Sequence, residues 1–378
     1  MEYLRLDEMC NIDMGQSPDS SSYNQEGKGI PFYQGNADFG DIYPVTRVWC
    51  NKPIKVVEKG TLLISVRAPI GALNFASVQS CIGRGLAGIT AKNELNLKYI
   101  YYALKYKRKE LNNKGTGSTF KALSKSSLGE ILIKDISIEE QIDCVKILDL
   151  IYNLITGQKD RLRQLEILVR ARFVEMFGDP ETNSRGWNEC ELLEKLNVLG
   201  GYAFKSDMFD EEEGIPVLRI GNINAGYFKP VNMVFWKRDS SLKRYAIYPG
   251  DLVMSLTGTV GKDDYGNICI IGNDYDMYYL NQRNAKMEIK EGIDKYYLFQ
   301  LLKFEQIKKK LTGISRGVRQ ANISNRDILN LVVPIPPIEL QNQFAAFVRQ
   351  VDKLKVTIQT QIEQTNLLFD SLMQQYFG

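Results

Sequence analysis

Histidine is absent from the 378 residues of this chain. That absence excludes Ser-His-Asp and Cys-His catalysis, the imidazole proton shuttle and most transition-metal sites. The six cysteines include no Cys-x-x-Cys pair, so neither a zinc site nor a disulfide framework is indicated and we expect reduced, structural thiols. The chain therefore has few of the side-chain combinations on which enzymes of this size depend.

Phosphate-binding and methyltransferase motifs are also missing. The sequence contains no GxxxxGK[ST] loop, no GxGxxG after a predicted strand and no NPPY-like tetrapeptide. The nearest lookalike, TGTVGKDD at residues 257–264, has the wrong spacing and lacks a Ser or Thr after its Lys. A nucleotide site is therefore not expected.

Long hydrophobic runs are absent as well. No stretch approaches the roughly 20 apolar residues that span a bilayer, and no basic leader precedes an apolar run near residue 1. With 44% hydrophobic and 25% charged residues, the composition is that of a globular protein. We expect a cytoplasmic location.

What the sequence does contain is the same unit twice. GIPFYQGN at residues 29–36 recurs as GIPVLRIGN at residues 214–222, and KGTLLISVRAPIG at 59–71 recurs as PGDLVMSLTGTVG at 249–261. The offset between the copies grows in small steps, as insertions in surface loops would make it grow. We infer a duplication that packs about an approximate internal two-fold axis and brings the two ends of the chain close together.

Each copy predicts the same elements. Short apolar runs rich in Val, Ile and Tyr predict strands at KGTLLISV, GDLVMSL and NICIIG. One helix is predicted near residues 95–113 and again near 293–311, with buried strands at 131–133 and 331–333 after them. The Pro of each GIP segment indicates an edge strand or the start of a strand, and the following Gly-Asn indicates a tight turn. The expected fold class is α/β, of the mixed α+β kind.

A heptad pattern ends each copy. Its apolar positions in the first copy are Leu148, Ile155, Leu162, Val169 and Met176, with Ile151 and Leu165 on the companion seam. In the second copy they are Val348, Ile362, Phe369 and Tyr376, with Phe344, Val351, Ile358 and Leu372 as companions. This pattern predicts two helices of about 60 Å packed as a coiled coil, longer than the core helices of two ordinary domains would be. Gly157 and Lys355 interrupt the pattern, which leaves open whether the first helix breaks or bends at Gly157.

Positive charge is concentrated at equivalent places in the two copies. Residues 98–125 contain eight Lys or Arg against one acid, and residues 303–326 contain seven against one, in a chain of net charge +3. One such block usually marks a solvated helix face. Each block here runs into a Gly/Ser/Thr-rich loop, whose backbone N–H and hydroxyl groups bind phosphates, while Arg reads guanine and Gln or Asn reads adenine. Two equivalent blocks in an otherwise acidic chain predict a polyanionic partner.

Taken together, these motifs resemble those of the specificity (S) subunit of type I restriction-modification systems. The resemblance covers essentially the full chain. It rests on MGQSP followed by Tyr23 and GIPFYQGN, on FGDP and GW before the second copy, and on PIPPIELQNQFA before the second heptad region. The first copy departs from the pattern, with IKDISIEEQ where a Pro-x-Pro-Pro segment is expected.

The resemblance implies two globular target recognition domains, residues 1–136 and 179–334, separated by two conserved spacer helices, residues 137–178 and 335–378, which form an antiparallel coiled coil. Each domain would read one half of a split, asymmetric DNA site, and the helices would fix the number of unread base pairs between the halves. Two methyltransferase subunits would dock on the chain, and two ATP-driven restriction subunits can join them. The chain itself would perform no chemistry, because S-adenosylmethionine, ATP and Mg would be bound by the partner subunits.

The residues expected to contact DNA come from both copies: Arg67, Arg84, Lys121 and Lys125 in the first, and Arg219, Thr257, Lys262, Arg283, Arg316, Arg319 and Gln320 in the second. Because Phe120 and Lys121 stand opposite Arg319 and Gln320, the two half-sites should differ in sequence. Three alternatives stay open. The chain could target a methylation-only complex, it could be a helical scaffold that binds no nucleic acid, or it could be an enzyme that uses lysines or carboxylates alone.

Overall fold

The computed structural model describes residues 2–116, 121–259, 262–313 and 320–378, and its fold is mixed α+β. The chain forms two compact units. Unit 1 consists of Met1–Asp160 and Gln359–Gly378, and unit 2 consists of Arg161–Ile358. Within the described residues, no helix combines the length and the apolar composition needed to cross a lipid bilayer.

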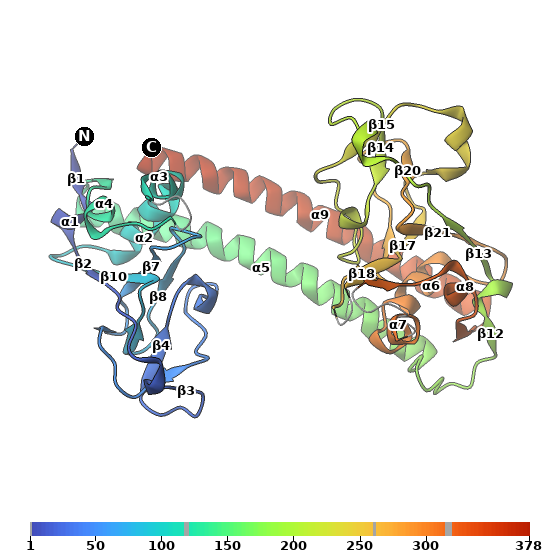
Figure 1. The fold of residues 1–378 in the computed structure, drawn as a ribbon, viewed down its shortest axis with the longest axis horizontal. Coiled ribbons are helices and arrows are strands. Elements are labelled where there is room, and N and C mark those ends of the chain that lie inside the picture. Colours follow the sequence, from blue (N-terminus) through green and yellow to red (C-terminus); the bar gives the residue numbers. More distant parts are fainter. Residues whose placement is uncertain (1, 117–120, 260–261, 314–319) are drawn as a thin grey trace. The chain divides into compact units, whose positions relative to one another are not determined.

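Two long helices contribute a segment to each unit. Helix α5 (Ile138–Phe177) and helix α9 (Ile338–Phe377) have 40 residues each (Figure 1). Helix α5 continues through Gly157 without a break, and a Cβ at that position would meet open space. The helical backbone is retained there at the modest cost of one glycine. The heptad residues of both helices are buried or half-buried.

The described residues of unit 1 form three sheets. The first is antiparallel and orders its strands β2 (Cys10–Met14), β10 (Leu86–Ala91), β7 (Leu62–Ser65) and β8 (Leu73–Phe75). The second orders β3 (Tyr23–Asn24), β5 (Trp49–Cys50), β4 (Ile30–Tyr33), β9 (Ser80–Ile82) and β6 (Val56–Val57), with β4 and β9 parallel. The third pairs β1 (Tyr3–Arg5) with β11 (Leu132–Lys134).

Within the described residues, unit 2 repeats this topology, except that its second sheet has four strands instead of five and that one two-stranded sheet is added. One antiparallel sheet orders β13 (Leu196–Gly200), β21 (Asn284–Ile289), β17 (Leu252–Ser255) and β19 (Ile268–Ile270). A second orders β15 (Val234–Trp236), β14 (Ile215–Leu218), β20 (Tyr278–Leu280) and β16 (Ala246–Ile247), with β14 and β20 parallel. Two pairs complete it, β12 (Glu189–Glu191) with β23 (Val332–Pro334) and β18 (Thr257–Thr259) with β22 (Gln320–Asn322). The strand runs predicted from KGTLLISV, GDLVMSL and NICIIG are confirmed.

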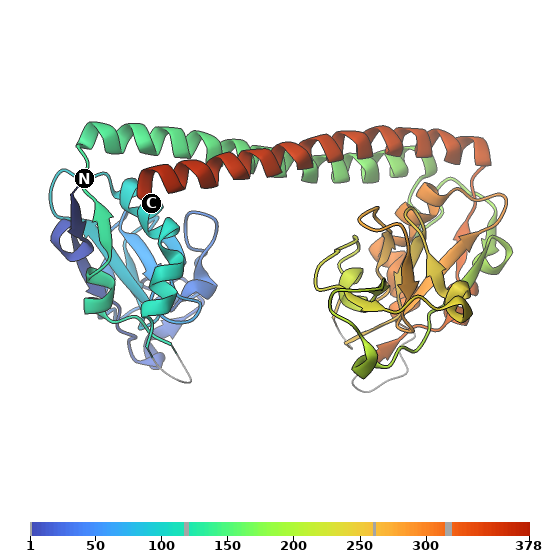
Figure 2. The same ribbon diagram turned by 90° about the horizontal axis from the view of Figure 1, so that it is seen from above.

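Short helices occupy the same places in the two units, except that the place of α1 is taken in unit 2 by a 3-10 helix (Leu192–Glu194). Unit 1 has α1 (Leu6–Met9), α2 (Leu97–Tyr106), α3 (Arg108–Lys114) and α4 (Lys125–Gly129), and unit 2 has α6 (Lys295–Leu302), α7 (Glu305–Thr312) and α8 (Asn325–Leu329). The single helix expected near 95–113, and again near 293–311, is therefore two helices in each unit. The backbone leaves the helical conformation at Lys107 in unit 1 and at Phe304 in unit 2. In each unit the strands lie to one side of its long-helix segments (Figure 2).

The GIP segments form the central strands β4 and β14. Gly29 and Gly214 have φ angles of 94° and 124°, and an added Cβ would lie 2.1 Å from the Cys50 carbonyl oxygen and 2.5 Å from that of Trp236. Only glycine fits such a conformation so close to a neighbouring strand. The expectation of an edge strand is wrong, since each GIP strand has a neighbour on both sides. The expectation of a strand start is confirmed, because each Pro is the second residue of its strand, where a missing N–H is tolerated.

The core of each unit includes parts of both long helices. In unit 1, Leu148 and Ile151 of α5 share a hydrophobic core with Phe369 and Phe377 of α9 and with Tyr99 of α2. In unit 2, Phe173 and Phe177 of α5 share a core with Phe344 of α9 and Tyr297 of α6. Each unit thus holds the beginning of one long helix and the end of the other.

The ends of the chain meet in unit 1. The Tyr3 hydroxyl donates a hydrogen bond to the Gly378 carbonyl at 3.3 Å. The predicted proximity of residues near 1 and 378 is confirmed.

Candidate nucleic-acid interface

Three segments of unit 1 meet at Val66, the residue that follows β7. The Val66 N–H donates to the Gly85 carbonyl at 2.9 Å, and the Val66 carbonyl accepts the Leu123 N–H at 2.8 Å. Arg67 forms a bridge with Ala122 on the neighbouring segment. These backbone bonds place Arg67, the turn at 83–85 and the segment at 121–123 side by side.

The same three segments meet at Leu256 in unit 2. The Leu256 N–H donates to the Arg283 carbonyl at 2.8 Å, and the Leu256 carbonyl accepts the Ile323 N–H at 2.8 Å. Thr257 pairs with Asn322 where β18 and β22 run together. We call this arrangement of backbone bonds the recognition frame. It is built at equivalent positions in both units.

A glycine lets a further loop approach each frame. An added Cβ at Gly15 would lie 2.2 Å from the Gly83 carbonyl oxygen, and one at Gly201 would lie 2.2 Å from that of Asn281. No real Cβ tolerates such a contact, so this position accepts glycine alone. The residues that follow Gly15 are thereby held against the turn at 83–85.

Polar side chains stand on the frame of unit 1. Gln34 follows β4 directly, and its amide nitrogen donates to the Ser17 hydroxyl oxygen at 3.0 Å. The same hydroxyl accepts the backbone N–H of Arg84 at 3.2 Å. Ser17, from the MGQSP motif, therefore ties together two residues whose side chains are exposed.

Two arginines stand on the frame of unit 2. The Arg219 guanidinium donates to the Asn232 carbonyl at 2.6 Å, and the Arg219 backbone N–H donates to the side chain of buried Asn222 at 3.0 Å. Arg219 and Arg283 line one depression of about 730 Å³, whose wall also includes Ser206, Asn232, Asn281 and Gln282. Such a wall presents guanidinium, amide and hydroxyl groups, together with the Glu211 carboxylate, to whatever enters.

Most of the predicted site residues gather at the two frames. Arg67, Arg84 and Lys121 come together in unit 1, and all three are exposed. Lys125 is exposed at the first position of α4, two residues after Leu123. All four side chains are exposed to solvent.

In unit 2, Arg219, Thr257 and Arg283 come together. Lys262 is exposed, and its N–H donates to the Thr259 carbonyl at the end of β18 at 3.0 Å. Gln320 pairs with Thr259 through its backbone in β22. Arg316 and Arg319 lie outside the described residues, as do Ser118, Thr119 and Phe120 of the first copy.

One lysine in the helical part of each basic block lies against aromatic rings. The Lys105 ammonium lies 4.8 Å from the ring centroid of Tyr152 on α5 and 5.3 Å from that of Phe369 on α9. Lys303, its counterpart in unit 2, lies 5.0 Å from the Phe299 ring. Burial lowers the pKa of both lysines. The interpretation of each whole block as a polyanion surface is therefore too broad, because Lys105 packs against the long helices and Lys303 against α6.

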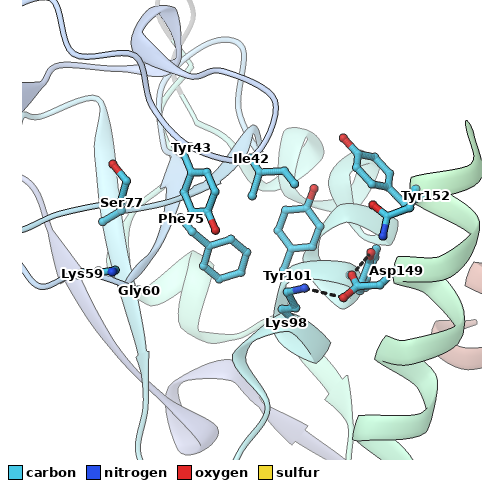
Figure 3. Close-up of a pocket in the computed structure, with 13 residues that line it drawn as sticks. Ile42, Tyr43, Lys59, Gly60, Phe75, Ser77, Lys98, Tyr101, Asp149 and Tyr152 are labelled. Carbon is cyan, nitrogen blue, oxygen red and sulfur yellow. Dashed lines mark hydrogen bonds and ion pairs between the residues drawn. The ribbon is translucent and has the colours of Figure 1, made fainter. Parts of the chain in front are cut away.

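A pocket in unit 1 differs in character from the depression in unit 2. This pocket of about 470 Å³ lies between the α2 region and α5 and is lined by Tyr43, Phe75, Tyr101 and Tyr152 (Figure 3). The Lys98 ammonium lies 2.5 Å from the Asp149 carboxylate, which also accepts the Tyr102 hydroxyl at 2.7 Å. Its aromatic lining and internally paired charges do not suit a polyanion.

No metal centre is found among the described residues, where no three His, Cys, Asp or Glu side chains are grouped as ligands. Sequence reasoning missed Ser17, Gln34 and Gln282. A signal for Gln34 was present, since aligning the two GIP segments places it opposite Arg219.

Comparisons with known proteins agree on one class. The fold matches the crystal structure of the S subunit of a type I restriction-modification system from M. genitalium, with a TM-score of 0.58 and 17% identity, over 100% of this chain and 96% of that one. The sequence matches the family described as "Type I restriction modification DNA specificity domain" over residues 1–166 and 184–365, and the chain belongs to that family.

Two curated relatives are type I specificity subunits of Methanocaldococcus jannaschii. The MjaX specificity subunit is 46% identical over 156 residues, which are 41% of this chain and 37% of that protein. The MjaVIII specificity subunit is 28% identical over 331 residues, which are 80% of this chain and 75% of that protein.

Proposed function

We propose that this protein reads a bipartite, asymmetric DNA sequence on behalf of a type I restriction-modification complex, with each unit reading one half. The observation that carries the proposal is the recognition frame itself. An identical set of backbone bonds at Val66 and Leu256 presents different polar side chains in the two units. A common scaffold with unequal side chains is what two related but different half-sites require.

The chemistry of the frame suits duplex DNA. Its side chains carry guanidinium, ammonium, amide and hydroxyl groups. Arg67, Arg84 and Lys121 in unit 1 and Arg283 in unit 2 are exposed, and Thr257 is half-buried. Arginine pairs bidentately with guanine and glutamine with adenine, while lysine neutralises phosphates. We assign target recognition to residues 1–136 and 179–334.

The long helices are proposed as the spacer, over residues 137–178 and 335–378. The early part of α5 shares a core with the late part of α9 in unit 1, and the late part of α5 with the early part of α9 in unit 2, an order that antiparallel partners produce. A 40-residue helix is about 60 Å long, a little under two turns of B-DNA. The helices would set the number of unread base pairs between half-sites.

Docking of methyltransferase subunits is proposed on the exposed apolar residues of these helices. Unit 1 exposes Leu154, Leu367 and Leu368, and unit 2 exposes their counterparts Leu354, Ile167 and Leu168. The exposed fractions reach 70% at Leu367 and 58% at Ile167. Because both units expose the same set, two copies of one partner would bind.

The chemistry would belong to those partners. In this proposal the chain is not catalytic, and S-adenosylmethionine, ATP and Mg are bound by the methyltransferase subunits and by up to two restriction subunits. The complex would work in the cytoplasm, where chromosomal DNA is found.

The decisive experiment is to express the chain with its cognate methyltransferase subunit and to map methylated adenines across a genome. We expect a two-part motif with a gap of fixed length. A continuous motif, or none, would contradict the proposal.

Binding itself is tested by measuring DNA affinity from 50 to 200 mM salt. Affinity should fall steeply as counterions are released from neutralised phosphates. A flat salt dependence would instead favour a scaffold that binds no nucleic acid.

Docking is tested by native mass spectrometry of complexes carrying Leu367→Asp, Ile167→Asp or both. Each single substitution should remove one methyltransferase subunit, and the pair should remove both. Gln374→Asp, at an exposed polar position of α9, is the matched control and should leave two subunits bound. Full occupancy of the double variant would place the docking surface elsewhere.

A further inference from the structure

Two positions on the recognition frame are strictly equivalent in the two units. Gln34 and Arg219 each follow the last residue of a GIP strand, β4 or β14. Arg84 and Gln282 each occupy the middle of the three-residue turn that joins β9 to β10 or β20 to β21.

Backbone bonds confirm this equivalence. The Gly83 N–H donates to the Tyr33 carbonyl at 2.8 Å, and the Asn281 N–H donates to the Leu218 carbonyl at 3.3 Å. The first residue of each turn is therefore attached to the last residue of each GIP strand, directly beside position 34 or 219.

The side chains at these positions are exchanged between the units. Unit 1 has Gln34 on the strand and Arg84 on the turn, whereas unit 2 has Arg219 on the strand and Gln282 on the turn. Glutamine and arginine are the side chains that pair bidentately with adenine and with guanine in the major groove. An ordinary surface would have no reason to carry this particular pair twice, in opposite order, on one frame.

All four residues have side-chain hydrogen-bonding groups left for a ligand. Gln34, Arg84 and Gln282 are exposed, and Arg219 is half-buried. The Arg219 guanidinium has five N–H donors, of which the bond to Asn232 uses one. The Gln34 amide nitrogen donates to Ser17 and its amide oxygen accepts the Ser17 hydroxyl at 3.1 Å. One N–H and the second lone pair of the oxygen are left for a base.

The backbone beneath the two turn residues is fixed. The Arg84 N–H donates to the Ser17 hydroxyl oxygen at 3.2 Å, and the Gln282 N–H donates to the Tyr202 carbonyl at 2.9 Å. A side chain on an anchored backbone loses less conformational freedom when it binds a base.

We propose that Gln34 and Arg84 in unit 1, and Arg219 and Gln282 in unit 2, are specificity-determining residues that contact base edges, with the adenine-reading and guanine-reading positions exchanged between the units. The inference rests on the proposed function and deepens it. It assigns base contact to Gln34 and Gln282, and it predicts that each half-site contains an adenine and a guanine in opposite order relative to the frame.

The test uses the complex of the full chain with its methyltransferase subunit and maps methylated adenines for single variants. Gln282→Arg should change the required base at one position of one half-site from adenine to guanine, and Arg84→Gln should make the reverse change in the other half-site. The lost preference should be roughly 5- to 150-fold, which corresponds to 1–3 kcal/mol for one bidentate pair. Arg84→Lys keeps the charge without the planar fork and should relax that position while methylation continues.

The matched controls are Arg244→Gln and Gln79→Arg, at exposed positions outside both frames, and they should leave the motif unchanged. The inference is overturned if Arg84→Gln and Gln282→Arg weaken methylation evenly at all sites, as loss of a phosphate contact would, or if both change the same half-site. Those results would leave a two-part wild-type motif intact, whereas failure of the proposed function would remove that motif from the wild-type complex itself.

Discussion

The side-chain oxygen of Gln341 accepts a hydrogen bond from the backbone N–H of Asp294 at 2.8 Å. Its amide nitrogen donates to the Pro336 carbonyl at 2.7 Å, so this buried residue joins the start of α6 to the start of α9. In unit 1, Gln141 accepts the Asn96 N–H at 3.0 Å and donates to the Ile136 carbonyl at 3.0 Å. Each unit is therefore fastened to the long helix that begins in it by the same pair of bonds.

Replacing Gln341 with leucine should destabilise the protein. The substitution leaves a buried N–H and a buried carbonyl without partners, and we expect the free energy of unfolding to fall by about 2–3 kcal/mol. Urea unfolding followed by circular dichroism measures the change. Gln343→Leu, at an exposed position two residues further along α9, is the control, and equal stability of the two variants would contradict the assigned role.

Phe173 should be a major contributor to the stability of unit 2. It is fully buried, and its ring centroid lies 4.9 Å from that of Phe177, 5.0 Å from Phe304 and 5.3 Å from Tyr297. Phe173→Ala should lower the free energy of unfolding by about 3–5 kcal/mol, because it leaves a cavity among these rings. The neighbouring Val174 is 40% exposed, and Val174→Ala should cost less than about 1 kcal/mol in the same thermal or urea measurement.

Lys105 should make stability depend on alkaline pH. Burial lowers the pKa of its ammonium, Lys159 lowers it further and Asp370 opposes the shift. The unfolded chain therefore binds more protons than the folded chain between the two pKa values, and stability rises with pH through that window. Relative to Lys105→Met, which lacks the titrating group, the wild type should gain stability between pH 7 and pH 10.5.

Urea unfolding of both proteins across this range tests the prediction. Taking the difference between them removes the contribution of the buried tyrosines, which is common to both. Parallel stability curves would show that the Lys105 proton is not linked to folding.

Lys121 should contribute through charge alone. It is exposed beside Ala122, the residue that bridges Arg67 on the frame. Lys121→Ala should weaken binding to all DNA sequences alike and reduce the salt slope of log affinity by about 1, as expected for one neutralised phosphate. Fluorescence anisotropy at several salt concentrations measures both, with Lys109→Ala on α3 as the exposed control. A sequence-dependent loss would instead assign Lys121 to base contact.

Much of the fold follows from periodicity. The heptad residues predict the buried seams of both long helices, because a seven-residue repeat reports directly which side of a helix is covered. The division between α2 and α3 could not be predicted in the same way, since Lys107, where the helical conformation ends, is neither Gly nor Pro. Packing of the two helices against different parts of the unit overrides local propensity there.

The candidate site was only partly accessible to sequence reasoning. Residue type identified Arg67, Arg84 and Lys121 one by one, but their proximity depends on backbone bonds at Val66 that carry no signature in the sequence. Gln34 was interpreted as part of a structural segment because it directly follows the GIP strand. Position 34 directly follows strand β4 and its side chain is exposed at the surface. The sequence indicates the first property, and only the tertiary structure shows the second.

The recognition frame is made of main-chain bonds, as at Val66 and Leu256, and of glycines that admit close approach, as at Gly15 and Gly201. Main-chain bonds do not depend on which side chain stands above them. Exposed positions such as 84 and 282 can therefore mutate with little penalty to folding. Under the proposed function, a lineage carrying this fold would acquire a new DNA target by point substitution, and would change one half of the target while inheriting the other.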